Sequence, residues 1–188
     1  MSSIHYLQEI SRFKKRISLF AGELPIKDSN AENSDMNSAQ NRRFLMRIVG
    51  ELHAIKACTV VRCNQHFYML YDKNRPLAKM LFVRSVKERF FLKQLAAELE
   101  KFGRTPEFRA TVKTCSEADD AYPASMSEKV LREHYAVHSM LVECYLELLA
   151  QLKKTNADTR IIWILNSMLI MEQKYALTEK NHFQHLAA

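Results

Sequence analysis

The sequence predicts an all-α protein, built as a four-helix bundle with one additional helix before it. Glycine and proline are scarce, at three and four of 188 residues, whereas β-sandwiches and nucleotide-binding α/β folds use many of both in their turns. Apolar residues recur at three- and four-residue spacing in several long segments, which is the period of an amphipathic helix. Signals for helix starts and ends separate these segments.

Length and composition indicate one globular domain. The chain is long enough for one full core and too short for two, and 47% hydrophobic and 26% charged residues are near globular averages. No G-x-G-x-x-G, G-x-x-x-x-G-K-[ST] or G-x-S-x-G motif occurs. The four cysteines lack zinc-finger spacing, and residues 1–20 lack the apolar run of a signal peptide. We therefore expect a cytoplasmic protein without integral membrane association.

The N-terminal part divides into a helix and a linker. Residues 1–20 place Leu7, Ile10 and Ile17 at helical spacing opposite a basic side, which predicts a short amphipathic helix. Residues 21–37 lose this periodicity and are rich in Asn, Ser and Asp, so they predict a polar linker.

The bundle is expected over residues 38–182, followed by a tail at 183–188. Pro76 suits the first turn of a helix, and Gly103 followed by Pro106 suits a helix end. Ser125 and Glu128 match a capping box that opens a later helix. The four bundle helices are predicted over residues 38–71, 76–102, 125–154 and 158–182. Gly50 interrupts the first of these, and a close helix–helix approach would explain it.

The lengths of the connections predict the topology. About four residues join the first bundle helix to the second, and about four join the third to the fourth. Such short links make the joined helices antiparallel neighbours. About 22 residues lie between the second and third bundle helices. A chain extends by about 3.3–3.6 Å per residue, so this segment can cross a bundle about 40 Å high. Two hairpins joined by one long crossover form the ferritin-like arrangement, which we expect here. A simple up-down bundle with one long loop has the same connection lengths.

Residues 87–106 carry a family resemblance. They contain the acidic–basic pair Glu88 and Arg89, regularly spaced leucines, a later glutamate, and Gly103 before Pro106. This stretch resembles the second helix of a bacterial branch of the ferritin-like superfamily that has no complete di-iron ligand set. The resemblance implies a helical bundle domain and assigns no activity.

The bundle helices contain candidate metal ligands. A di-iron carboxylate site takes a Glu from each of two helices and Glu-x-x-His from each of the others. Glu88 and Glu172 lie within apolar stripes, yet Phe91 and Tyr175 stand where that histidine belongs. His138 on the third helix and Glu51 on the first could complete a site for iron or manganese.

Two other interpretations of these residues stay open. A buried carboxylate is costly unless it is paired or ligated. The carboxylates could therefore form a polar network with Arg84, Arg47 or a protonated histidine. Alternatively, the stripes could be rotated so that Glu88 and Glu172 reach water.

The charge is uneven along the chain. The formal net charge is +7, and basic residues exceed acidic ones by nine between residues 41 and 104. Such a surface attracts acidic proteins and the phosphate backbones of nucleic acids, or it is simply solvated. No nucleic-acid-binding motif occurs to support binding of nucleic acid. The predicted basic surface consists of Arg42, Arg43, Arg47, Arg84, Lys87 and Arg89.

We therefore expect a non-enzymatic interaction or regulatory module. The sequence has no convincing nucleophile constellation, and this function needs no cofactor. The expected partners are a second copy of the chain or an acidic protein. The alternatives are a metal-binding bundle with an oxidoreductase or metal-storage role, and a basic nucleic-acid-binding protein.

Overall fold

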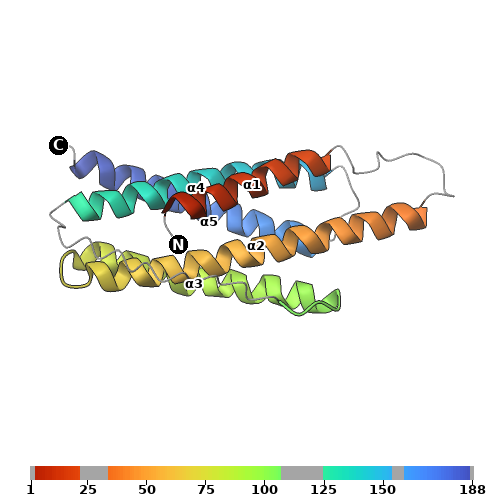
Figure 1. Cartoon of the computed structure of the whole chain (residues 1–188), viewed down its shortest axis with the longest axis horizontal. Helices are drawn as coiled ribbons and strands as arrows, with labels where there is room; N and C mark the ends of the chain where they lie inside the picture. Colours follow the sequence, from red (N-terminus) through yellow and green to blue (C-terminus); the bar gives the residue numbers. More distant parts are fainter. Residues whose placement is uncertain (1–2, 22–33, 107–124, 154–158, 187–188) are drawn as a thin grey trace.

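The computed structural model describes residues 3–21, 34–106, 125–153 and 159–186. Nearly all of them are helical, and no strand occurs within these ranges, so the predicted all-α class is confirmed. The helices run roughly along the long axis of the molecule (Figure 1). They are α1 (Ser3–Ala21), α2 (Ser34–Leu70), α3 (Arg75–Lys101), α4 (Ser125–Leu152) and α5 (Thr159–Leu186).

The ends of α3 follow the local signals in the sequence. The Asn74 side chain accepts a hydrogen bond from the Leu77 backbone N–H at 3.2 Å, and Pro76 lies in the first turn, where no N–H is needed. At the other end Gly103 has φ +72°. Its N–H donates to the Glu100 carbonyl at 2.9 Å, and the Arg104 N–H donates to the Leu99 carbonyl at 3.0 Å. This is a Schellman motif, as the glycine predicts.

Two helices are longer than the sequence indicates. Helix α2 begins at Ser34 rather than at residue 38, since Ser34 and Asp35 suit the first turn of a helix as well as a linker. Helix α5 reaches Leu186 and so includes most of the predicted tail 183–188. Residues 22–33 of the predicted linker lie outside the described residues.

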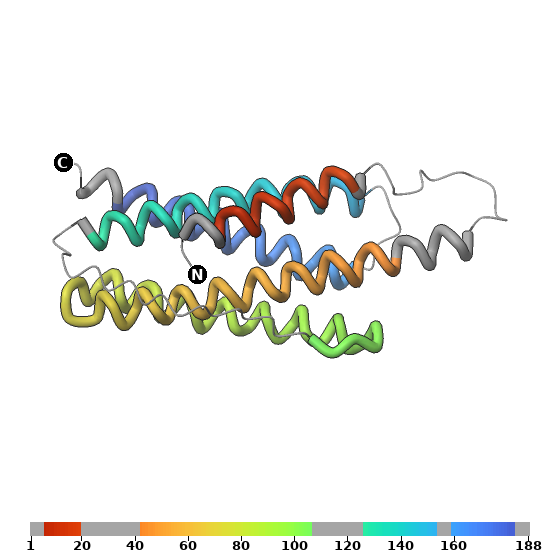
Figure 2. Tube along the Cα trace, in the orientation of Figure 1, coloured from red at the N-terminus to blue at the C-terminus, as the bar shows by residue number. Residues whose placement is uncertain are grey.

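The helices form two antiparallel pairs, α2 with α3 and α4 with α5 (Figures 1 and 2). Helix α1 lies against α4 and α2. The end of α3 and the start of α4 lie at opposite ends of the molecule (Figure 2). The connection between them, of which residues 107–124 are outside the described part, therefore joins the two ends.

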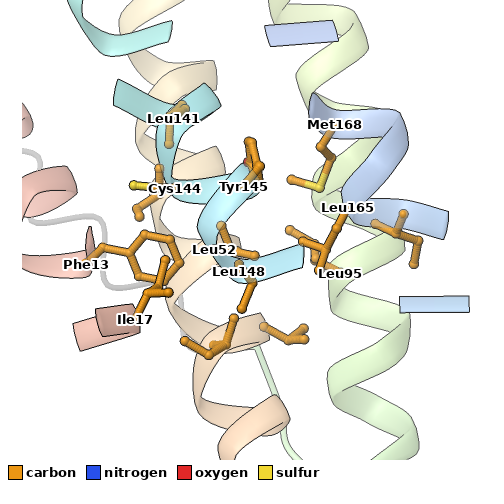
Figure 3. Close-up of a cluster of buried hydrophobic side chains, with 14 of the residues drawn as sticks. Phe13, Ile17, Leu52, Leu95, Leu141, Cys144, Tyr145, Leu148, Leu165 and Met168 are labelled. Atoms are coloured by element: carbon orange, nitrogen blue, oxygen red, sulfur yellow. The ribbon is translucent and has the colours of Figure 1, made fainter. Parts of the chain in front are cut away.

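The main apolar core contains residues from all five helices. Phe13 and Ile17 of α1 pack near Leu52 of α2, while Leu95 of α3 lies near Leu165 of α5 (Figure 3). A smaller apolar cluster lies near the α2–α3 turn and the start of α4. Along α2, α3 and α4, buried polar residues lie between the parts that belong to these two clusters.

Gly50 lies within α2 at a position where a side chain would have room. A Cβ atom at Gly50 would meet only Leu99 Cδ2, at 3.9 Å, which is an ordinary contact. The expectation of a close helix–helix approach at Gly50 is therefore wrong.

No helix in the described part of the chain is long and apolar enough to cross a membrane.

Candidate functional site

A layer of buried ionic side chains crosses the bundle between the two apolar clusters. Each of its members is at most 1% exposed. Four helices contribute to it, so the layer forms only when both helix pairs pack together. We call it the ionic layer, and it consists of Lys56, Arg84, Glu88, His138, Glu172 and Glu179.

Lys56 of α2 lies between two glutamates of other helices. Its Nζ is 2.7 Å from Glu88 Oε2 on α3, and it also forms an ion pair with Glu172 Oε1 on α5. Burial by itself lowers the pKa of Lys56, but Glu172 and Glu88 raise it well above its usual value. The ammonium group therefore stays charged and balances the two carboxylates.

His138 joins the two halves of the layer through its two ring nitrogens. Its Nε2 is 3.0 Å from Arg84 Nη1, and its Nδ1 bonds Glu172 Oε2. Arginine only donates, so Nε2 must accept and the proton must be on Nδ1, which donates to the carboxylate. Burial, Arg84 and Lys56 lower the pKa of His138 well below its usual value. The imidazole is therefore neutral with a defined tautomer.

Arg84 of α3 completes the layer. Its Nη1 forms an ion pair with Glu179 Oε1 on α5, and its guanidinium lies 4.2 Å above the centre of the Tyr175 ring. Burial raises the pKa of Glu179 to about 7 although Arg84 opposes this shift, and burial also raises the pKa of Glu88. Three carboxyl groups face two fixed cations, so the binding of one proton by one of these glutamates balances the charge of the layer.

Neutral histidines extend the buried polar region toward the α2–α3 turn. His66 Nδ1 and His134 Nε2 are 2.9 Å apart, and the His134 ring stacks on that of His138 with centroids 5.8 Å apart. Burial lowers the pKa of His66 to about 4 and lowers that of His134 well below its usual value. Both rings are therefore neutral at neutral pH, and one ring donates an N–H hydrogen bond to the bare nitrogen of the other.

Several buried polar atoms of this region have no hydrogen-bond partner among the described residues. They include Glu88 Oε1, Arg84 Nε, Arg84 Nη2, Glu179 Oε2 and the Tyr145 hydroxyl. Unpaired buried polar groups are costly, and they mark places where water or a ligand would be stabilised.

The donor set for a metal exists, but side-chain cations hold the corresponding positions. One ligand atom from each of His134, His138 and Glu179 lies within 4.8 Å of the others. Arg84 Nη1 contacts both His138 Nε2 and Glu179 Oε1, so the guanidinium lies where such an ion would bind. In the same way, the Lys56 ammonium lies between Glu88 and Glu172. The geometry thus favours the polar-network interpretation over a metal site.

The structure brings together three of the four predicted ligands. Glu88, His138 and Glu172 meet in the ionic layer, and the interpretation in which Glu88 and Glu172 reach water is wrong, because both are 0% exposed. Glu51 does not join them. Its Oε2 instead lies 3.0 Å from Arg16 Nε on α1, near the surface.

The predicted basic surface also needs one correction. Arg84 is 1% exposed, because its position on α3 faces α4 and α5, and it belongs to the interior. Its five companions are exposed as predicted: Arg42, Arg43, Arg47, Lys87 and Arg89.

Sequence reasoning missed two members of the ionic layer, and each left a signal. Lys56 follows Leu52 at helical spacing on the apolar side of α2. Glu179 lies seven residues after Glu172 and begins a Glu-x-x-His pattern with His182, although His182 itself is exposed. An ionisable residue within an apolar stripe was the signal in both cases.

A second candidate site is an apolar and basic surface on the outside of the α2–α3 hairpin. Large apolar side chains are exposed there by 44% to 76% of their area. We call this surface the hairpin patch, and its apolar members are Tyr68, Met69, Tyr71, Phe82, Val83, Val86 and Phe90. Exposed apolar groups that lie together typically mark a binding surface.

The hairpin patch includes a shallow groove and several cations. The ring of Phe67 lies 5.5 Å from that of Tyr71 and 5.3 Å from that of Phe82. A groove of about 300 Å³ runs beside these rings and is also lined by Arg75 and Lys79. The exposed side chains of Lys87 and Arg89 continue the positive charge along α3.

Comparison of the sequence with protein-family models and with curated proteins gives no match.

Proposed function

We propose that this protein is a ferritin-like bundle that acts as a non-enzymatic interaction module, with the hairpin patch as its docking surface. The observation that carries this proposal is the row of exposed apolar side chains on α3 with cations on either side. A protein that needed only to be soluble would place polar residues at these positions.

The arrangement of the helices supports the ferritin-like part of the proposal. Two antiparallel pairs are present, and the end of α3 is separated from the start of α4 by the length of the bundle (Figure 1). This separation supports a bundle with one long crossover. Lys56 and Arg84 supply the positive charge that metal ions supply in di-iron bundles, so the carboxylates are balanced without a redox centre.

The chemistry of the hairpin patch indicates an acidic, amphipathic protein segment as the partner. Phe82, Val86 and Phe90 recur every four residues along one side of α3, a spacing that suits the apolar face of a partner helix. The neighbouring cations Lys79, Lys87 and Arg89 would attract carboxylates at the edges of such a helix and increase its association rate.

Binding of synthetic probes tests this function. The fluorescence anisotropy of three labelled probes would be measured with the full chain: an acidic amphipathic helical peptide, a basic peptide of the same apolar pattern, and a single-stranded oligonucleotide. We expect saturable binding of the acidic peptide only. Binding of the oligonucleotide in preference to the peptide would replace this function with nucleic-acid binding, and equal binding of both peptides would also overturn it.

Matched variants localise the binding. We expect Phe82→Ser with Phe90→Ser to weaken binding of the acidic peptide by at least about tenfold, since exposed aromatic anchors contribute most of the affinity of such surfaces. Leu146→Ser is the control, because Leu146 is similarly exposed on α4 but lies outside the hairpin patch. If the control weakens binding as much as the test variant, the hairpin patch is not the docking surface.

The His134, His138 and Glu179 cluster supports a metal-binding role as the second candidate. Binding of iron or manganese there requires Arg84 to leave His138 Nε2. Elemental analysis of protein purified without chelators tests this role, and we expect far less than one equivalent of metal per chain. A stoichiometric metal that is lost in His134→Ala would overturn the preference for a metal-free bundle.

A further inference from the structure

A groove between α3 and α5 opens directly beside the ionic layer. Its volume is about 350 Å³. Its lining combines cationic and apolar side chains and contains no acidic residue. The lining residues are Pro76, Lys79, Met80, Val83, Arg84, Lys87, Lys174, Tyr175 and Thr178.

The charge in this groove is strongly positive. Lys79, Lys87 and Lys174 are exposed around it, and none of them forms an ion pair within the described ranges of the chain. Arg84, at 1% exposure, forms its floor. Because Arg84 is paired with Glu179, the three lysines carry the net positive charge around this concave space, and they raise the local concentration of anions there.

The floor of the groove also has hydrogen-bond donors to spare. Glu179 and His138 both contact Nη1 of Arg84, while Nε and Nη2 are buried with no partner among the described residues. The Tyr175 hydroxyl in the same lining is likewise without a partner there. A guanidinium edge, a hydroxyl and three ammonium groups together match an acceptor with several oxygens.

We propose that this groove binds an organic phosphate, a phosphate monoester attached to a small apolar or aromatic group. The phosphate would accept hydrogen bonds from Arg84 and the surrounding lysines. The apolar group would lie against Pro76, Met80 and Val83, which form the uncharged part of the lining. A single carboxylate would leave several of these donors unused, whereas a dianionic phosphate uses them. The groove shares Lys79, Val83 and Lys87 with the hairpin patch and its cations, but binding there needs no partner protein.

Isothermal titration calorimetry of the full chain tests the site with three probes. Phenyl phosphate supplies both parts of the proposed ligand, inorganic phosphate supplies the anion alone, and phenol supplies the ring alone. We expect saturable binding of phenyl phosphate with one site per chain, weaker binding of inorganic phosphate, and no binding of phenol. Equal affinity for phenyl phosphate and inorganic phosphate would overturn the organic part of the proposal, and absence of saturable binding would overturn the site.

A matched pair of variants separates a built site from general attraction of anions. Lys87→Gln with Lys174→Gln removes two cations from the groove, and we expect phenyl phosphate to bind at least about tenfold more weakly. Arg89→Gln with Lys93→Gln removes the same charge from exposed positions of α3 outside the groove lining, and we expect little change. Equal weakening by both variants would show non-specific electrostatics and overturn the site. Phe82 and Phe90 lie outside the groove lining, so Phe82→Ser with Phe90→Ser tests the hairpin patch without changing the groove, and the two proposals fail separately.

Discussion

Lys56 shows at the residue scale how this bundle accommodates a charge in its interior. Its ammonium is fully buried and bridges Glu88 on α3 and Glu172 on α5. Removing one partner from a buried ion pair leaves an uncompensated charge, which costs far more than losing an exposed pair. Glu88 and Glu172 therefore depend on Lys56 for their place in the core.

We expect Lys56→Met to lower the free energy of unfolding by about 3–5 kcal/mol, because it leaves two buried carboxylates without their cation. Chemical denaturation followed by circular dichroism measures this change. Lys93→Met on the exposed side of α3 is the control and should change stability by no more than about 0.5 kcal/mol. Adding Glu88→Gln and Glu172→Gln to Lys56→Met should recover part of the loss, and no recovery would contradict the assigned ion pairs.

His66 gives the bundle a dependence on pH. Burial lowers its pKa to about 4, whereas the unfolded side chain binds a proton near pH 6.5. The unfolded state therefore holds more protons in this range, and stability falls as the pH drops from about 6.5 to 4. The neutral imidazole is maintained by burial beside His134.

We expect His66→Gln to make the loss of stability between pH 6.5 and 4 less steep by about 1 kcal/mol per pH unit. The measurement is the free energy of unfolding at several pH values for the variant and the natural sequence. His182→Gln replaces an exposed histidine and is the control for the loss of an imidazole outside the core. A slope unaltered by His66→Gln would mean that this histidine is not buried in its neutral form.

At the scale of single elements, two glycines have opposite roles. Gly50 lies inside α2 with room for a methyl group, while Gly103 ends α3 in the left-handed region at φ +72°. A helical glycine costs stability relative to alanine, but a left-handed position favours glycine over residues with a Cβ atom.

We expect Gly50→Ala to stabilise the protein by about 1 kcal/mol and Gly103→Ala to destabilise it by about 1 kcal/mol. Thermal unfolding of the two variants side by side measures both effects, and each serves as the control for the other. Destabilisation by Gly50→Ala would show that α2 and α3 approach more closely than the Leu99 contact indicates.

Helix α1 is part of the core although it precedes the bundle. Ile10, Phe13 and Ile17 are each 0% exposed against α2 and α4. We expect Phe13→Ala to cost about 3–5 kcal/mol, as for other large side chains removed from a packed core. Leu19→Ala on the exposed side of the same helix should cost almost nothing. Equal stability of the two variants in urea denaturation would mean that α1 is only loosely attached.

At the scale of the whole molecule, the two helix pairs are linked by shared ion pairs as well as by the core. Lys56 joins α2 to α5, and Arg84 joins α3 to both α4 and α5. We expect a single cooperative unfolding transition for this reason. Fluorescence of Trp163, the only tryptophan, reports on α5, and circular dichroism reports on all helices. A fluorescence transition that precedes the loss of helix would show that the pairs unfold separately.

Much of the fold follows from local features of the sequence, whereas the candidate sites follow only in part. The Pro76 and Gly103 signals act within a few residues at the two ends of α3, so they can be read without knowing any neighbour. Glu88 and Glu172 could be identified as unusual because they interrupt apolar stripes. Their partners could not, since pairing depends on how far each helix is rotated and shifted against helices distant in sequence.

The sequence by itself determined that the chain forms long helices, that two connections are short and one is long, and that ionisable residues enter the apolar faces. These properties depend on periodicity and on capping, which act over a few residues. Only the tertiary structure decided that Lys56 and Arg84 balance the buried carboxylates, that Glu51 stays with Arg16, and that a cationic groove opens between α3 and α5. A rotation of one residue position, about 100°, moves a side chain from the core to water, so these contacts are set by packing.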